Sequence, residues 1–157
     1  MLRFARLPAL FLAICAMDAP GARADDWKTC FSIGSNDFKN EAFVAKGLEA
    51  CTQVIASRRV KGADLGRVYI TRGYWQHRRG QLDAAMVDYN KGLDIAPADF
   101  EGYDYRADLW SDMGNDERAL ADYEQSIRVN PKYSAAHLSR GRIYEKRGEI
   151  ERARTEY

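Results

Sequence analysis

The amino-acid sequence predicts an all-α fold made of antiparallel helix hairpins that stack side by side. Three observations support this prediction. Several residue types recur at a step of 34 positions, glycines and prolines recur at the same step, and the residues between them are amphipathic at the helical period. A repeat of this length is typical of a helix-turn-helix unit that is stable only when neighbouring units pack against it.

The repeated columns fall in the second half of the chain. Glycine, alanine and tyrosine each recur three times at the step of 34, and proline recurs twice. The columns are Gly80, Gly114 and Gly148; Ala85, Ala119 and Ala153; Tyr89, Tyr123 and Tyr157; and Pro97 and Pro131. They define units at residues 66–99, 100–133 and 134–157, and the last unit is shorter than one full step.

The turn residues predict where the helices of each unit begin and end. The three glycines are expected to end the first helix, since a residue without a Cβ tolerates the left-handed conformation found there. The two prolines follow the second helix and prevent it from continuing. Asp99, Asn115 and Ser134 are expected to cap the N-termini of the helices that follow them.

Small residues mark the place where the two helices of a unit should cross. They occupy the eighth and twentieth positions of every unit, where small side chains would let the backbones approach closely. These packing residues are Gly73, Ala107 and Gly141 on the first helices, and Ala85, Ala119 and Ala153 on the second helices.

Three segments together resemble the tetratricopeptide repeat (TPR) family. They are YITRGYWQHRRGQLDAAMVDYNKGLDIAP, YDYRADLWSDMGNDERALADYEQSIRVNP and HLSRGRIYEKRGEIERARTEY. The resemblance covers residues 66–157 and implies a right-handed superhelix, or solenoid, with a concave groove lined by the first helix of each hairpin. One departure is that Arg72, Arg106 and Arg140 stand where the family more often has leucine.

The resemblance also implies which side chains face the groove. The first unit supplies basic and aromatic residues, the second acidic residues and the third a mixture. The candidate partner-binding residues are Ile70, Tyr74, His77, Asp104, Asp108 and Arg142. Such a groove suits a protein or peptide segment that places Lys or Arg against the two aspartates, with an apolar anchor near the isoleucine and the tyrosine.

Residues 25–65 are expected to form a degenerate first unit. Gly47, Cys51 and Val54 have the spacing of a second helix, whereas glycine, serine and asparagine in the preceding segment CFSIGSNDF argue against a regular first helix. In an exported chain, Cys30 and Cys51 are expected to form a disulfide. The alternative is two unpaired buried thiols, and a metal site would lack further ligands. This part resembles small exported TPR proteins of alphaproteobacterial type.

The start of the chain has the layout of a secretory signal peptide. Arg3 and Arg6 precede an apolar run over residues 7–17, which is too short to cross a bilayer as a helix. The small residues Ala22 and Ala24 then predict cleavage after Ala24, which would place the protein in the periplasm or outside the cell. The alternative is a buried amphipathic helix at the N-terminus.

A lipid anchor at Cys15 is disfavoured, because the bulky Ile14 stands where a lipoprotein signal requires a small residue. Residues 1–24 hold Arg3, Arg6, Arg23 and Asp18, so their removal changes the formal charge from +1 to −1. A nearly neutral chain argues against nucleic acid as a partner.

The sequence favours a binding protein over an enzyme. It has no phosphate-binding glycine loop, no nucleophile elbow and no metal-binding histidine pair, so we expect no catalytic residue, cofactor or metal. The main hypothesis is a scaffold of the bacterial cell envelope that binds a protein segment, with self-association also open. The alternative is a recruitment or regulatory domain of a larger enzyme or envelope assembly, truncated at residue 157.

Overall fold

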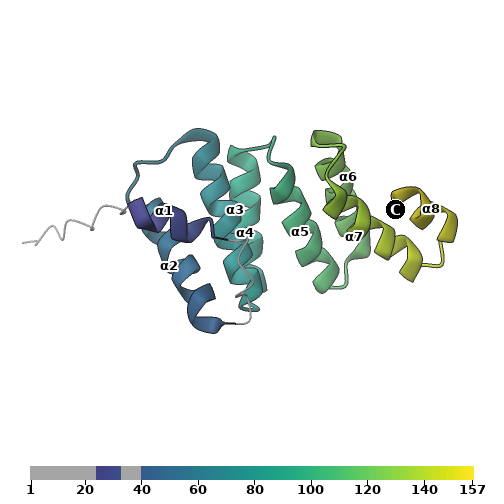
Figure 1. Cartoon of the computed structure of the whole chain (residues 1–157), viewed down its shortest axis with the longest axis horizontal. Helices are drawn as coiled ribbons and strands as arrows, with labels where there is room; N and C mark the ends of the chain where they lie inside the picture. Colours follow the sequence, from purple (N-terminus) through teal and green to yellow (C-terminus); the bar gives the residue numbers. More distant parts are fainter. Residues whose placement is uncertain (1–23, 33–39) are drawn as a thin grey trace, which may run out of the picture.

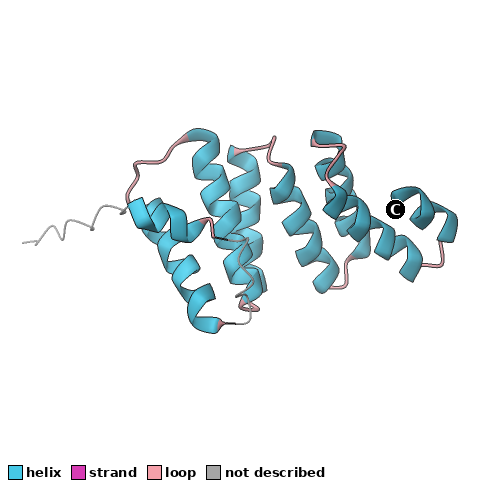
Figure 2. Cartoon of the chain, in the orientation of Figure 1, coloured by secondary structure: helices cyan, strands magenta, loops and turns pink. Residues whose placement is uncertain are grey.

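The computed structural model describes residues 24–32 and 40–157, and the regular elements in these ranges are all helices (Figure 2). The expected signal peptide lies outside the described residues except for Ala24. The helices are α1 (Ala24–Cys30), α2 (Glu41–Ala56), α3 (Gly62–Arg78), α4 (Leu82–Ile95), α5 (Phe100–Asp112), α6 (Asp116–Val129), α7 (Ser134–Lys146) and α8 (Ile150–Glu156).

The helices pair into hairpins that follow one another along the long axis of the molecule (Figure 1). α3 packs on α4, α5 on α6 and α7 on α8. Consecutive hairpins meet where α4 contacts α5 and where α6 contacts α7. This arrangement is the all-α solenoid that the step of 34 predicts. α3 begins at Gly62, one turn before the position at which α5 and α7 begin in their own units.

The helix boundaries follow from capping residues and glycine turns. The side chain of Asp99 accepts a hydrogen bond from the Gly102 amide at 3.0 Å, and that of Asn115 accepts one from the Arg118 amide at 3.1 Å. Both predicted caps are therefore confirmed. Ser134 is not a cap: it is the first residue inside α7, and Tyr133 holds the cap position without a capping side chain.

The three repeated glycines adopt the expected left-handed conformation, with φ values of 72° at Gly80, 77° at Gly114 and 75° at Gly148. The amide that follows each glycine reaches back to a carbonyl five residues earlier, as in the bond of 3.0 Å from Gln81 to Gln76. This bond satisfies a carbonyl that the end of the helix leaves unpaired, and it turns the chain into the second helix.

The predicted crossing of small residues is visible in the first hairpin. A Cβ atom added to Gly73 would lie 2.8 Å from the ring of Tyr89 and 3.2 Å from the carbonyl oxygen of Ala85. In the second hairpin, Ala107 and Ala119 are completely buried in one apolar cluster. Larger side chains at these positions would push the two helices apart.

The arginines that depart from the family pattern have a common role. Arg72 donates two hydrogen bonds to Asp88, at 2.6 and 2.8 Å, and Arg106 donates two to Asp122, both at 2.8 Å. Each arginine lies on the first helix of a hairpin, and its acidic partner lies 16 residues later on the second. The ion pairs therefore recur with the repeat and join the two helices of each hairpin.

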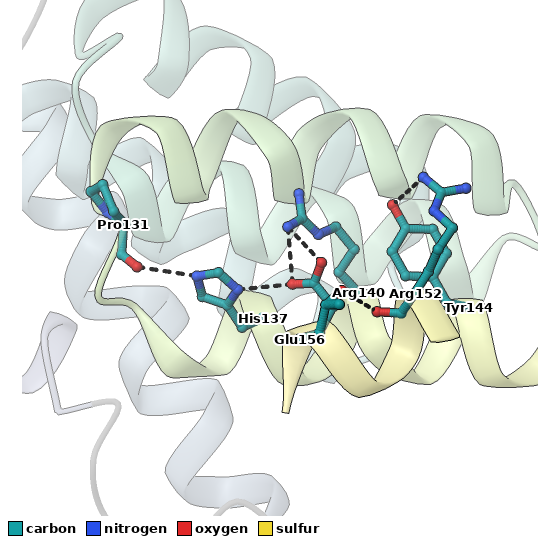
Figure 3. Close-up of polar contacts among 7 residues, drawn as sticks. Pro131, His137, Arg140, Tyr144, Arg152 and Glu156 are labelled. Atoms are coloured by element: carbon teal, nitrogen blue, oxygen red, sulfur yellow. Dashed lines mark hydrogen bonds and ion pairs between the residues drawn. The ribbon is translucent and has the colours of Figure 1, made fainter. Parts of the chain in front are cut away.

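The third hairpin keeps this ion pair in an altered form (Figure 3). Arg140 donates to both carboxylate oxygens of Glu156, at 2.7 and 2.9 Å, and His137 lies on the other side of the same carboxylate, with its Nδ1 2.8 Å away. The Nε2 of His137 is 3.1 Å from the carbonyl oxygen of Pro131. In the preceding repeat, the hydroxyl of Tyr103 makes the equivalent contact, 3.3 Å from the carbonyl oxygen of Pro97. His137 thus has a structural role in this hairpin.

The first unit begins with a short helix that precedes the breaker residues. α1 ends at Cys30, before most of those residues, and packs against α2. Asp25 and Asp26 lie in its first turn and Lys28 lies in its last turn. Their charges interact favourably with the helix dipole and so stabilise this short helix. The expectation that the first helix of this unit is missing or poor agrees with α1, which has only seven residues and ends where the breaker segment begins.

A disulfide joins α1 to α2, as predicted: the Cys30 and Cys51 sulfur atoms are 2.13 Å apart. The indole of Trp75, on α3, donates a hydrogen bond of 2.9 Å to the Cys30 carbonyl. Trp75 is completely buried and fits against Gly47, where any Cβ would lie 2.4 Å from the indole ring. These contacts attach the first unit to the repeats.

Candidate partner-binding groove

Two hollows lie between the first helices α3 and α5, the second of them also next to α1, and together they form the groove described below. The first hollow, of about 460 Å³, is lined by Tyr74, His77, Arg78, Tyr105, Asp108, Ser111 and Asp112. The second hollow, of about 500 Å³, is lined by Trp27, Phe31, Arg67, Ile70, Thr71, Asp99, Glu101 and Tyr105. Tyr105 lines both hollows, so they adjoin each other.

Three of the predicted partner-binding residues line the first hollow. Tyr74 and His77 reach it from α3, and Asp108 reaches it from α5. The His77 Nε2 is 2.8 Å from a carboxylate oxygen of Asp112, an ion pair that spans the groove when the imidazole is protonated. The hollow therefore combines aromatic surface, two carboxylates and the basic side chains of His77 and Arg78.

Ile70 does not serve as an exposed apolar anchor, because only 3% of its surface is accessible. Gly92 on α4 and Gly102 on α5 leave the room into which its side chain fits, and a Cβ on either glycine would lie within 2.6 Å of it. Ile70 belongs to the core between the first two repeats and contributes only to the floor of the second hollow.

Asp104 is also buried, with 5% of its surface accessible. One carboxylate oxygen accepts a hydrogen bond from the Tyr133 hydroxyl at 3.2 Å, and the other has no hydrogen-bond partner among the described residues. Burial, with the nearby charges of Asp108 and Glu101, raises the pKa of Asp104 to about 7, although the Tyr133 hydrogen bond opposes this shift. A carboxylate in such a position is stabilised by a cation.

Asp108 lies between the groove and the core. Its Oδ1 accepts a hydrogen bond of 2.5 Å from the hydroxyl of Tyr123, on α6. Burial raises the pKa of Asp108, while the Tyr123 hydrogen bond and the positive potential of His77 and Arg142 oppose the increase. The predicted groove residue Arg142 is exposed on α7, outside both hollows, and acts on Asp108 only through its charge.

Sequence reasoning missed two contributions to the groove. Tyr105 packs against Tyr74, with ring centroids 5.0 Å apart, and separates the two hollows. Trp27 and Phe31, from α1 and the residue after it, form an aromatic wall of the second hollow. The repeat pattern could not reveal this wall, because α1 precedes the first recognisable repeat.

Within residues 24–32 and 40–157, no group of three or more His, Cys, Asp or Glu side chains could hold a metal ion. None of the helices over these same ranges has both the length and the apolar character needed to cross a bilayer.

The stacked hairpins and the groove define a helical-repeat scaffold, a class that presents a concave surface to its partners. Two models of the tetratricopeptide repeat match the sequence, one at residues 66–99 and 106–133 and the other at residues 122–155. The chain therefore belongs to the tetratricopeptide repeat family. Repeats of this family support a role in protein–protein interaction.

Two similar proteins are much longer than this chain. The tetratricopeptide repeat and J domain-containing co-chaperone DNJ1 of Cryptococcus neoformans is 34% identical over 77 residues, which are 49% of this chain and 15% of that protein. Human DnaJ homolog subfamily C member 3 is 30% identical over 78 residues, 50% of this chain and 16% of that protein. The chain thus spans about a sixth of the length of these relatives.

Solved structures share the fold at low sequence identity. The crystal structure of MamA is 17% identical with a TM-score of 0.63, and the match covers 76% of this chain and 67% of that one. A tetratricopeptide repeat protein from Parabacteroides merdae is 20% identical with a TM-score of 0.66, covering 84% of this chain and 49% of that one. These likenesses support the solenoid fold alone.

Proposed function

We propose that the protein is exported to the bacterial cell envelope, where its groove binds a basic segment of a partner protein. The observation that carries this proposal is the concentration of carboxylates on the groove side of α5. Asp108 and Asp112 line the first hollow, and Asp104 is buried beside them with one oxygen that has no hydrogen-bond partner among the described residues.

The charges around the first hollow favour a cationic ligand. Asp104 and Asp108 both have raised pKa values, mainly because burial removes water from their carboxylates. An incoming Lys or Arg would add positive charge next to Asp108, beyond that of His77 and Arg142, while the rings of Tyr74 and Tyr105 would pack against its aliphatic part. An acidic segment would be repelled by the same carboxylates.

Selection from a display library of random dodecapeptides tests groove binding. We expect the mature protein to enrich peptides that contain Lys or Arg, and the Asp108→Asn, Asp112→Asn double variant to lose this enrichment. A matched control is Asp83→Asn, which removes an exposed charge on α4, a second helix. Enrichment of acidic peptides, or no enrichment at all, would contradict the proposal.

Export is supported by the basic, apolar and small-residue regions of residues 1–24 and by the disulfide, which is stable in oxidising compartments. Fusion of residues 1–24 to alkaline phosphatase should give enzyme activity in a bacterial host, because that reporter folds only after export. Replacing Leu10 and Leu12 with arginine should abolish the activity. Mass spectrometry should find Asp25 at the mature N-terminus, and an uncleaved, cytoplasmic chain would refute export.

A further inference from the structure

The second hollow has an aromatic wall that does not come from the repeats. Trp27 and Phe31 pack against each other with ring centroids 4.6 Å apart, and Trp27 keeps 38% of its surface accessible. Tyr105, on α5, also lines this hollow. Aromatic faces that line one hollow form a favourable environment for a flat cation.

The hollow also contains a carboxylate without a partner. Glu101 is partly buried, and within the described part of the chain it forms no hydrogen bond or ion pair. Burial raises the pKa of Glu101, the charge of Asp99 adds to the increase, and the charge of Arg67 opposes it. Arg67 itself is 3.7 Å from Asp99 and lies over the Phe31 ring at 5.7 Å. Arg67 forms its ion pair with Asp99 and not with Glu101, so its charge compensates that of Glu101 only in part.

We propose that this hollow is a second subsite of the groove and binds the guanidinium group of an arginine side chain. The subsite rests on the proposed function, because the arginine belongs to the same basic segment that occupies the first hollow. The guanidinium pairs with Glu101, and its face packs against Trp27 or Tyr105. Arginine suits the site better than lysine, because its guanidinium group is planar and is less strongly hydrated than the ammonium group of lysine.

The disulfide is what positions the aromatic wall. Trp27 and Phe31 flank Cys30, which is bonded to Cys51 on α2, and the Cys30 carbonyl accepts the hydrogen bond from Trp75 on α3. A helix as short as α1 is not stable by itself in water. The subsite therefore depends on a covalent bond that lies outside the groove.

Titration with arginine amide, followed by NMR of the tryptophan indole N–H groups, tests the subsite. We expect the Trp27 signal, assigned from a Trp27→Phe variant, to shift over a millimolar range of arginine amide. Citrulline amide has nearly the same shape and the same α-ammonium group but a neutral side chain, so it should give no shift, and lysine amide should bind more weakly than arginine amide. Ionic strength is kept constant with sodium chloride.

Variants separate the two hollows. Glu101→Gln should abolish the Trp27 shift, whereas Asp112→Asn, which alters only the first hollow, should preserve it. Tyr74 and His77 resonances report the first hollow independently. Replacing both Cys30 and Cys51 with serine should remove the Trp27 shift while the resonances of α5 and α6 keep their folded positions.

The possible outcomes distinguish the subsite from the proposed function. Shifts confined to Tyr74 and His77 would overturn the subsite and leave the proposed function intact. An equal response to citrulline amide would show an apolar rather than a cationic site and would also overturn it. A Trp27 shift that persists in Glu101→Gln would refute the role of that carboxylate, and no shift in either hollow would contradict both proposals.

Discussion

The first unit and the repeats that follow it are held together by different chemistry. In the repeats, an arginine on the first helix pairs with an acid on the second, as in Arg72 with Asp88 and Arg106 with Asp122. In the first unit, the buried face of α2 has no charged residue and consists of Val44, Gly47, Ala50, Cys51 and Val54. There the disulfide and Trp75 connect the helices instead.

This difference shows how a repeat protein can end its regular pattern. Each repeat has neighbours that bury its surface, so a partly buried ion pair is enough to fix how its two helices pack. The first unit has a first helix of only seven residues, which contributes little buried surface, and a covalent bond offsets that loss. The same bond holds the segment whose aromatic residues Trp27 and Phe31 line the second hollow.

Removing the disulfide should have the largest effect on stability. Replacing Cys30 and Cys51 with alanine should lower the free energy of unfolding of the first unit by about 3 kcal/mol, because the loop that the bond closes gains entropy in the unfolded chain. Hydrogen exchange should show lost protection in α1 and α2 with little change in α5 to α8. A uniform loss along the chain would contradict the contrast between the two regions.

Breaking one ion pair should have the next largest effect. Asp88→Leu leaves Arg72 partly buried without its partner and should cost roughly 2–3 kcal/mol in urea unfolding. Adding Arg72→Leu, the residue more common in the family, should recover most of that loss.

The exposed pair of Arg154 and Glu151 supplies the control, because 71% and 83% of these side chains are accessible. Glu151→Leu should change stability by less than about 0.5 kcal/mol. If Asp88→Leu behaves like this control, the repeated ion pair does not hold the hairpin together.

A further prediction is a pH dependence of stability that arises from Asp104. Its pKa is about 7 in the folded protein and about 4 in an unfolded chain, so the folded state holds the extra proton between these values. Stability must therefore fall as pH rises from 4 to 7, and the full penalty remains above 7.

Asp104→Asn should remove this dependence. The variant should gain stability relative to the natural protein as the pH rises from 4 to 8, because an asparagine binds no proton in this range. Thermal unfolding at several pH values measures the change, with Asp83→Asn as an exposed control. A stability difference that does not change with pH would contradict the shifted pKa of Asp104.

Much of the groove could be predicted from the repeat register. Positions nine, twelve and thirteen of two successive units supply six of the residues that line the first hollow, including Tyr74, His77 and Asp108. Ile70 and Asp104 have groove positions by register but are buried, because Gly102 accommodates the first and Tyr133 contacts the second. These contacts come from neighbouring helices, and the pattern within one unit does not contain them.

The sequence alone determined the class of the protein, because periodic glycines, alanines and prolines impose turns and close helix crossings wherever they occur. It also predicted the disulfide from the number of cysteines and the expected compartment. Only the tertiary structure decided that Arg72 finds Asp88, that Trp75 reaches Cys30 and that Trp27 faces the groove. The physical reason is that such contacts depend on the distance and angle between helices, which long-range packing sets and local residue preferences do not.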